Sequence, residues 1–286
     1  MNAAVQQAVS AMRTRYAEPV TPRGLAAEAF VSPFHFSRVF SATTGTTPGR
    51  FLAAVRMFEA KRLLVSSPLT VAEIVAAIGY TSVGTFTSRF SGSVGLTPSR
   101  YREQQVGELL VTSSTGASRL PSIGTLRAAE AAVSPVWPVG RAAVVATLDV
   151  APAPEIGPDP DRLLVAAFAE SIPQRGPVAY GYLTEPDFRR PVEAVLADVP
   201  PGRWTVLALG TTGSPDGDPG SGAEWIARAT VAVGPDGPVR VRLRLRPVRE
   251  ADPPIAVTLA STLAARRELL ERRRRRGTAP TPFRVA

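Results

Sequence analysis

The stretch that decides the fold is SVGTFTSRFSGSVGLTPSRY, from Ser82 to Tyr101, because it repeats SPFHFSRVFSATTGTTPGRF, from Ser32 to Phe51. At an offset of 50 residues, the first serine, two phenylalanines, a glycine and a Thr-Pro pair are identical in both stretches. A repeat of this length corresponds to one supersecondary unit. The sequence therefore predicts two copies of a small helical unit.

Helix-capping signals indicate what each unit contains. Ser32-Pro33 and Thr47-Pro48 provide an N-cap followed by a proline at the first helical position, and Gly45 is suited to end the helix between them. Together with a short helix opened by Thr21-Pro22, this spacing predicts a helix-turn-helix. The helix from Pro48 to about Val65 would connect the two copies as a rod of about 27 Å.

The periodicity of each repeat helix separates an inward face from an outward face. The inward face carries a pair of phenylalanines, Phe36 and Phe40 in the first copy and Phe86 and Phe90 in the second, which we expect in the core. The outward faces differ, because the first carries an aromatic residue and an arginine whereas the second is small and uncharged. The outward residues are Phe34, Ser37, Arg38 and Ser41 in the first copy, and Gly84, Thr87, Ser88 and Ser91 in the second.

Composition and charge limit the classes of function. The 286 residues suffice for two domains, and the formal charge of +9 is concentrated in residues 1–105, which hold eleven basic and five acidic side chains. A basic segment favours a polyanion as its partner. With no cysteine and a single histidine, a zinc site or a His-based catalytic triad is not expected. No signal peptide or membrane-spanning run is evident, so the sequence predicts a cytoplasmic protein that is not associated with a membrane.

Two segments of the chain resemble the AraC/XylS family of bacterial transcription regulators. They are LAAEAFVSPFHFSRVFSATTGTTPGRFL and VAEIVAAIGYTSVGTFTSRFSGSVGLTPSRYR. The resemblance covers about residues 5–105. It implies an all-α DNA-binding domain with two helix-turn-helix units on a rigid connecting helix. Each recognition helix would enter one of two successive major grooves of double-stranded DNA, so that one protomer binds without a symmetric partner. The implied function is sequence-specific regulation of transcription, as activator or as repressor.

The resemblance also implies which residues contact DNA. Arg38 is the most base-specific of these candidates, since a guanidinium can donate two hydrogen bonds to guanine O6 and N7. The alternative is that Arg38 is solvated or contacts a phosphate. Phe34 could pack on a thymine methyl group, or it could simply cap the packing between the helices. Base contacts are carried over to Phe34, Ser37, Arg38, Val83, Gly84, Thr87 and Ser88, and phosphate contacts are expected at Arg50, Lys61, Arg62, Arg89 and Arg100.

The second copy departs from the family pattern at one position. Many members have arginine where this chain has Ser88, and the arginine here stands one residue later, at Arg89. A shift of one residue rotates a side chain by about 100° around the helix, so Arg89 is expected to meet a phosphate or an acid of the protein. The hypothesis is that the first half-site is read more stringently than the second.

The remaining chain has a different pattern. Residues 107–140 read as a linker with one helical turn near Leu126 to Ala132, and residues 141–249 as an antiparallel β-sandwich. The stretch DVPPGRWTVLALG is weakly similar to transthyretin-like and carboxypeptidase-regulatory-like sandwiches. The seven expected strands are Ala142–Val150, Leu163–Ala169, Val178–Leu183, Val192–Val199, Trp204–Leu209, Ile226–Val233 and Val239–Val248.

Three charged features of this half each have a functional and a simpler structural explanation. The alternating strand PVRVRLRLRPV places four arginines on one face, either as an anion site or as a solvated face balanced by acids. Asp216, Asp218 and Glu224 fit no EF-hand spacing and read as a solvated turn. In residues 250–286, a helix from Ile255 to Arg276 runs into an arginine-rich tail that is either a solvated helix end or an added phosphate contact.

Three classes of function remain open for the whole chain. In the first, the carboxyl-terminal domain of a regulator senses an unidentified small-molecule effector, contacts a partner such as RNA polymerase, or forms a homodimer. In the second, an enzyme or ligand-processing domain carries a DNA-binding appendage. In the third, the carboxyl-terminal domain is a pure interaction module, which a flat sandwich without a pocket would favour. No cofactor or metal is implied by the motifs, and the first, non-enzymatic class is the expected one.

Overall fold

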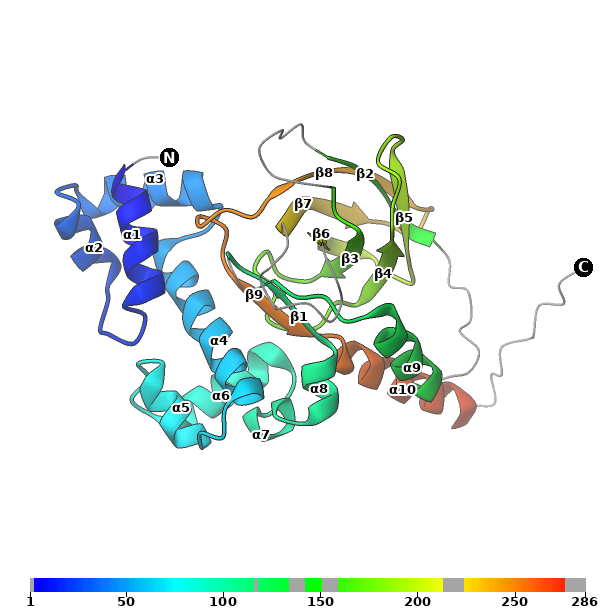
Figure 1. The fold of residues 1–286 in the computed structure, drawn as a ribbon, viewed down its shortest axis with the longest axis horizontal. Helices are drawn as coiled ribbons and strands as arrows, with labels where there is room; N and C mark the ends of the chain where they lie inside the picture. Colours follow the sequence, from blue (N-terminus) through cyan, green and yellow to red (C-terminus); the bar gives the residue numbers. More distant parts are fainter. Residues whose placement is uncertain (1–2, 116–117, 134–141, 151–158, 213–223, 276–286) are drawn as a thin grey trace, which may run out of the picture.

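The computed structural model describes residues 3–115, 118–133, 142–150, 159–212 and 224–275, and it shows a helical half packed beside a sheet-rich half (Figure 1). The helical half consists of α1 (Ala3–Thr14), α2 (Pro22–Glu28), α3 (Pro33–Thr44), α4 (Pro48–Ser66), α5 (Val71–Ala77), α6 (Val83–Val94), α7 (Pro98–Tyr101) and α8 (Gln104–Glu108). The sheet-rich half consists of β1 (Leu110–Ser113), α9 (Ile123–Val133), β2 (Ala142–Val150), β3 (Arg162–Phe168), β4 (Ala179–Thr184), β5 (Val192–Ala197), β6 (Gly202–Thr211), β7 (Glu224–Val233), β8 (Val239–Pro247), β9 (Ile255–Thr258) and α10 (Ala260–Arg275).

The sequence repeat is also a structural repeat, down to single hydrogen bonds. The Ser32 hydroxyl accepts from the His35 amide at 3.3 Å, and the Ser82 hydroxyl accepts from the Thr85 amide at 3.2 Å. Both repeat helices end at a glycine in the left-handed conformation, with φ of 71° at Gly45 and 81° at Gly95. The caps therefore set the same start and stop for α3 and α6.

The phenylalanine pairs build matching cores under the two repeat helices. The ring centroids of Phe36 and Phe40 lie 5.6 Å apart, and those of Phe86 and Phe90 lie 5.4 Å apart. All four side chains are buried, as the helical period predicts. The expected all-α helix-turn-helix domain is confirmed.

Helix α4 belongs to both cores and therefore fixes one unit relative to the other. Its first half contributes Phe51 and Val55 to the core formed with α1, α2 and α3. Its second half contributes Ala60 and Leu64 to the core formed with α5, α6 and α7. With 19 residues, the helix is about 28 Å long.

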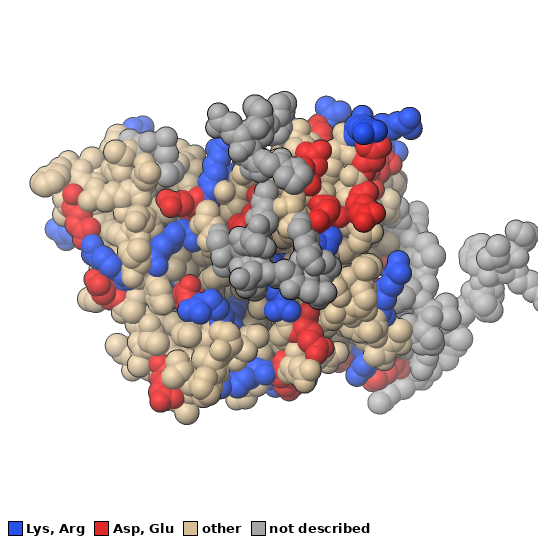
Figure 2. Space-filling model, in the orientation of Figure 1, with Lys and Arg blue, Asp and Glu red and all other residues tan. Residues whose placement is uncertain are grey.

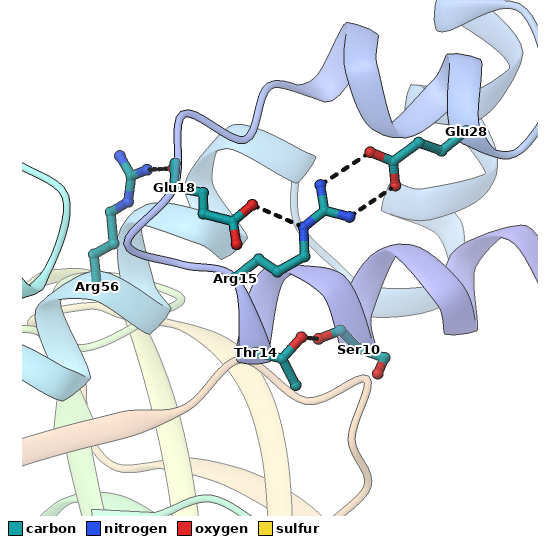
Figure 3. A network of polar contacts seen from close by, with 6 residues as sticks. All are labelled: Ser10, Thr14, Arg15, Glu18, Glu28 and Arg56. Atoms are coloured by element: carbon teal, nitrogen blue, oxygen red, sulfur yellow. Dashed lines mark hydrogen bonds and ion pairs between the residues drawn. The ribbon is translucent and has the colours of Figure 1, made fainter.

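A polar network orients the first unit on α4 (Figure 3). Arg15 holds the Glu28 carboxylate of α2 with contacts of 3.0 and 3.2 Å, and it contacts the Glu18 carboxylate at 3.1 Å. Arg56 of α4 donates to the carbonyl oxygens of Tyr16 and Glu18 at 2.7 and 2.8 Å. The hydrogen bond from Arg15 lowers the pKa of Glu28 below its ordinary value. The network ties α1, α2 and α4 together at the surface.

The seven strands β2 to β8 form one sheet in the order β4-β3-β6-β7-β8-β2-β5. All neighbours pair antiparallel except β2 and β8, which are parallel. Because the edge strands β4 and β5 also lie close together, the sheet curls into a nearly closed barrel. We call this sheet the barrel.

The expected strands were located correctly to within a few residues, but they form one nearly closed sheet with a parallel pair, so the details of the expected antiparallel β-sandwich are not supported. A strand that alternates between two environments fits the inner face of a sandwich and the interior of a barrel equally well. The short pairing of β7 with β8 joins strands β4, β3, β6 and β7 to strands β8, β2 and β5. This pairing cannot be read from the sequence of either strand.

Strands β3 and β6 are apolar on both faces because each face covers a different core. In β3, Leu163 and Val165 point into the barrel, while Leu164 and Ala166 point outward. The outward side chains are covered by the two-stranded sheet of β1 and β9 together with α9 and α10. The barrel thus has an inner core and a second core between its wall and this covering layer.

The covering layer corrects two expectations about connecting segments. Residues 107–140 were expected to be a linker, but they contain β1 and α9, and β1 pairs with β9 in the register Val111 to Val257. The helix expected from Ile255 begins only at Ala260, because Ile255–Thr258 is the strand β9. Both strands have four residues, and each forms its backbone hydrogen bonds with the other.

Charged features of the sheet-rich half follow the simpler explanation where they are described. On β8, Arg240 contacts Glu193 of β5 at 3.4 Å and Arg242 contacts Asp149 of β2 at 3.9 Å, so acids of the same sheet balance these two arginines. Asp216, Asp218 and the tail from Arg276 onward lie outside the described residues, as do the side chains of Arg272 to Arg275. On the face shown in Figure 2, basic and acidic side chains are interspersed over both halves.

Candidate nucleic-acid interface

The outward face of α3 presents three of the residues expected to contact bases. Phe34 is 82% exposed, and Arg38 is exposed one turn further along the helix. Ser37 lies between them and is half-buried. The large apolar side chain at Phe34 is unusual on a solvent-facing helix and suits an apolar partner such as a thymine methyl group.

The corresponding face of α6 is smaller and carries no charge at the same positions. Val83 is 42% exposed, Gly84 and Ser88 are exposed, and Thr87 is half-buried. A Cβ atom added at Gly84 would meet nothing within 4 Å, so packing within the chain does not require this glycine. Gly84 therefore leaves room for a close approach from outside the chain.

Three of the residues expected at phosphates are exposed and accessible. Arg50 and Arg100 follow the two Thr-Pro caps at equivalent positions of the repeat, and Arg89 lies on α6. Arg100 has an acid nearby, since its Nε lies 3.8 Å from Glu103. Arg62 is exposed too, but it forms an ion pair of 2.8 Å with Glu59 one turn earlier on α4.

Lys61 does not lie on this surface, and its expected phosphate contact is corrected. The side chain is fully buried between α4 and the barrel. Its ammonium donates to the backbone oxygen of Gln174 at 2.8 Å, to the Gln174 side-chain oxygen at 2.9 Å and to the backbone oxygen of Ala256 at 2.6 Å. All three ammonium protons are therefore used inside the chain.

Burial changes the ionisation of Lys61. Loss of hydration lowers the pKa of Lys61 to about 7, and the charge of Glu170 opposes this shift. A signal for this burial was present in the sequence, since Lys61 stands four residues after Met57 and three before Leu64, on the apolar stripe of α4. Its partner Gln174 lies 113 residues away and gave no such signal.

Other contacts also join the barrel to the helical half. Arg13 of α1 donates to the backbone oxygens of Glu250 and Asp252, and burial lowers its pKa. Arg175, in the connection between β3 and β4, donates to the backbone oxygen of Gly92 at 3.0 Å near the end of α6. Within the described residues, no hydrogen bond or ion pair from the barrel reaches the base-facing side chains of α3 or α6.

Among the described residues, no group of three or more His, Asp or Glu side chains is placed to hold a metal ion. No helix in that part of the chain is both long enough and apolar enough to cross a membrane.

Comparisons with known proteins point to the same surface. A family model described as a helix-turn-helix domain, of the AraC type, matches residues 25–104. A helix-turn-helix transcriptional regulator of Mycobacterium tuberculosis is 39% identical over 79 residues, which cover 28% of this chain and 30% of that protein. AdaA of Bacillus subtilis, a bifunctional transcriptional activator and DNA repair enzyme, is 28% identical over 88 residues, or 31% of this chain and 42% of that protein.

Among solved structures, the DNA-binding domain of the global transcriptional factor AdpA in complex with a target DNA is 29% identical. The match covers 35% of this chain and 89% of that chain, with a TM-score of 0.33. This chain spans less than half the length of each of the two curated relatives, and the barrel lies outside the matched region. Residues 25–104, which include α3 and α6, are a helix-turn-helix domain of the AraC type.

Proposed function

We propose that the whole chain is a sequence-specific transcription regulator that places α3 and α6 in two successive major grooves of DNA. The observation that carries the proposal is the pair of equivalent, exposed helix faces held at opposite ends of one rigid helix. Helix α4 is about 28 Å long, and successive major grooves on one side of DNA are roughly 34 Å apart. One protomer can therefore occupy both grooves.

In this function the two copies divide the recognition of bases and backbone. Arg38 donates two hydrogen bonds to guanine O6 and N7, and Phe34 packs on a thymine methyl group. In the second groove, the Thr87 and Ser88 hydroxyls and the small Val83-Gly84 surface meet base edges. Arg50, Arg89 and Arg100 contact phosphates, which fix the register without carrying sequence information.

The unequal chemistry of the two faces predicts unequal readout. A bidentate arginine contact discriminates against a wrong base by about 1–3 kcal/mol. A hydroxyl group discriminates less, because it can form a hydrogen bond with several different bases. A base-substitution scan of a site selected from random DNA would test this, with the affinity of the full chain measured for every single change. Larger penalties are expected in the half-site under α3, and equal penalties in both half-sites would contradict the proposal.

The barrel is proposed as the regulatory half of the protein. Its β3–β4 connection contacts α4 through Gln174 and α6 through Arg175, which supports this role because a change in the barrel can reach α6 without crossing a flexible linker. The barrel is also the proposed site for contacts with RNA polymerase or with a second copy of the chain. Since the proposed target is DNA, the working protein would reside in the bacterial cytoplasm.

The proposal includes no catalytic step. The alternative, an enzyme that carries a DNA-binding appendage, has a precedent in the name of AdaA. Genome-wide mapping of bound sites with the full chain and with a variant lacking the barrel would separate the two classes. A regulator requires bound sites upstream of genes whose expression changes when the chain is removed, and the absence of such sites would contradict it.

A further inference from the structure

A cavity of about 170 Å³ lies where the helical half meets the barrel. One wall is formed by α4 and α6, and the other by the connection from Glu170 to Gln174 between β3 and β4. The volume is below the roughly 300–1,000 Å³ of pockets that hold drug-sized molecules. A small metabolite is therefore the size of ligand that fits.

The helical wall supplies two arginines from different elements. Arg50 comes from the first turn of α4 and Arg89 from α6, and both side chains line the cavity. Within the described part of the chain, neither guanidinium has a hydrogen bond or an ion pair, so both keep all their donors. Two converging guanidinium groups are suited to an oxyanion, because each can offer a planar pair of N–H donors.

The barrel wall supplies groups of the opposite kind. The Glu170 carboxylate is a hydrogen-bond acceptor and would repel a second negative charge. Gln174 accepts from Lys61 through its side-chain oxygen, which orients its amide nitrogen as a remaining donor. A ligand that fits both walls has an anionic end toward the arginines and a hydrogen-bond donor toward Glu170.

The apolar part of the lining is packed and therefore preformed. Met57 and Ile172 are buried at the cavity wall. The ring of Tyr80 is held on one side by Phe86, at 5.5 Å between centroids, and approached by the Arg56 guanidinium at 5.9 Å. These side chains can cover a short carbon skeleton without rearranging.

The connection that forms this wall is anchored along its second half. Gln174 is held by Lys61, and Arg175 by the backbone oxygen of Gly92. At Gly176 a Cβ atom would lie 2.6 Å from the backbone oxygen of Thr258, so only glycine fits there, and the Pro177 backbone oxygen accepts from Thr262 at 2.7 Å. Contacts with α4, α6 and α10 thus hold this part of the wall in place.

We propose that this cavity binds a small organic carboxylate that also carries a hydrogen-bond donor, such as an amino acid or a hydroxy acid. Its carboxylate lies between Arg50 and Arg89, its donor faces Glu170, and its carbon atoms contact Met57 and Tyr80. A site built from both halves senses their relative position, which is what a regulatory ligand requires.

The site has a consequence for DNA binding that rests on the proposed function. Arg50 and Arg89 are also the residues proposed to contact phosphates. A carboxylate that occupies both guanidinium groups removes two phosphate contacts, so ligand and DNA compete. The bound ligand is therefore expected to weaken the binding of DNA.

Calorimetric titration of the full chain, without DNA and at constant ionic strength, tests the site itself. The probes are alanine, lactate, propionate and inorganic phosphate. Saturable binding of alanine or lactate is expected, tighter than that of propionate or phosphate because only the first two present a donor to Glu170. If neither binds with a dissociation constant below about 10 mM, the proposed site does not exist.

Variants assign the binding to the cavity. Arg50→Gln and Arg89→Gln are each expected to weaken binding of the ligand at least tenfold, and Glu170→Ala, which removes the acceptor, to abolish the preference for lactate over propionate. Arg100→Gln is the matched control, because Arg100 occupies the position of Arg50 in the second copy and does not line this cavity. Equal affinity in the native chain and in both arginine variants would overturn the assignment.

A third measurement distinguishes whether Arg50 and Arg89 bind a free carboxylate ligand or only a phosphate of the DNA backbone. Fluorescence anisotropy with a labelled DNA site is measured with and without the ligand that binds best. A loss of DNA affinity in both arginine variants, without binding of any small probe, would mean that the cavity serves only a DNA phosphate, which overturns the proposal. If the full chain binds no DNA, the proposed function fails, whereas the calorimetric result for the cavity stands.

Discussion

The two copies of the helix-turn-helix unit share a scaffold but differ in what they present to DNA and in what holds them. The first copy exposes Phe34 and Arg38, and no hydrogen bond or ion pair among the described residues ties α3 to the barrel. The second copy exposes Gly84 and Ser88, and Arg175 of the barrel binds it near the end of α6. The two copies thus share their packing, whereas their exposed faces differ in chemistry and in their contacts with the sheet-rich half.

The largest expected effect tests whether the two scaffolds are equally stable. Phe40 and Phe90 are both fully buried, and each meets an aromatic ring edge-on, Phe51 in the first copy and Tyr101 in the second. Phe40→Ala and Phe90→Ala should each lower the free energy of unfolding by about 3–5 kcal/mol, as measured by urea denaturation. The control Phe34→Ala, at an exposed position, should change it by less than about 0.5 kcal/mol.

A large loss in only one of the two core variants would contradict the equivalence of the scaffolds. It would mean that one copy depends on the barrel for its stability. The midpoint of unfolding and the denaturant slope are compared separately, because a change in slope alone reports a change in compactness.

The next effect concerns the buried lysine between the two copies. Folding lowers the pKa of Lys61 from its ordinary value of 10.5 to about 7. Between these values the unfolded chain binds a proton that the folded chain has released, so the free energy of unfolding should rise with pH across this window. The slope has an upper limit of about 1.4 kcal/mol per pH unit.

The matched variant for this measurement is Lys61→Met, which retains the length of the side chain but cannot titrate. Urea denaturation of both proteins at intervals from about pH 7 to about pH 10 gives the difference in slope. The native chain should gain stability relative to the variant as the pH rises. Parallel pH profiles would show that Lys61 keeps an ordinary pKa in the folded chain.

A smaller effect sharpens the contrast between the two recognition surfaces. Arg38→Ala should weaken binding to the preferred DNA site by about 1–3 kcal/mol and relax the requirement at one base position. Ser88→Ala should cost less than about 1 kcal/mol, because a neutral hydroxyl makes a weaker contact than a guanidinium. Equal losses, measured by fluorescence anisotropy at one salt concentration, would remove the proposed asymmetry.

The converse substitution, Ser88→Arg, places an arginine on the exposed face of α6. It should strengthen binding to DNA sites with a guanine in the second half-site and leave the first half-site unchanged. Arg89→Ala serves as the comparison, since a phosphate contact affects all DNA sequences alike.

The smallest expected effect isolates the contact between the barrel and α6. Arg175 is exposed, and its bond to the Gly92 backbone oxygen should contribute less than about 1 kcal/mol to stability. Arg175→Gln should nevertheless speed the exchange of amide hydrogens at the end of α6 while leaving the end of α3 unchanged. Unchanged exchange in both helices would show that the barrel does not restrain the second copy.

The sequence predicts what depends on neighbours along the chain, and it fails where distant segments meet. Ser32, Gly45, Ser82 and Gly95 mark the ends of α3 and α6 through local backbone rules, so both helices were located correctly. The seven barrel strands follow from local alternation in the same way. Strands β1 and β9 contain only four residues each and pair across more than 140 residues, so no local pattern separates them from a linker and a helix end.

In the candidate site, too, the features set by local sequence were predicted and those set by distant contacts were not. The exposed face of α3 follows from the helical period, and Phe34 and Arg38 lie where that period places them. Lys61 was assigned to the surface because a lysine is rarely buried without partners. Its partners, Gln174 and Ala256, reach it only through the docking of the barrel, which the pattern within α4 does not contain.

The pairing of β1 with β9 determines where this protein can be divided. Strand β1 begins two residues after α8 ends, so a fragment that extends from the DNA-binding domain to residue 140 includes β1 but lacks its partner. Its unpaired backbone groups and apolar side chains would form an open strand edge, which favours self-association. A fragment that stops at Glu108 avoids that edge, and a barrel expressed separately needs Leu110–Ser113 at its own amino terminus to remain soluble.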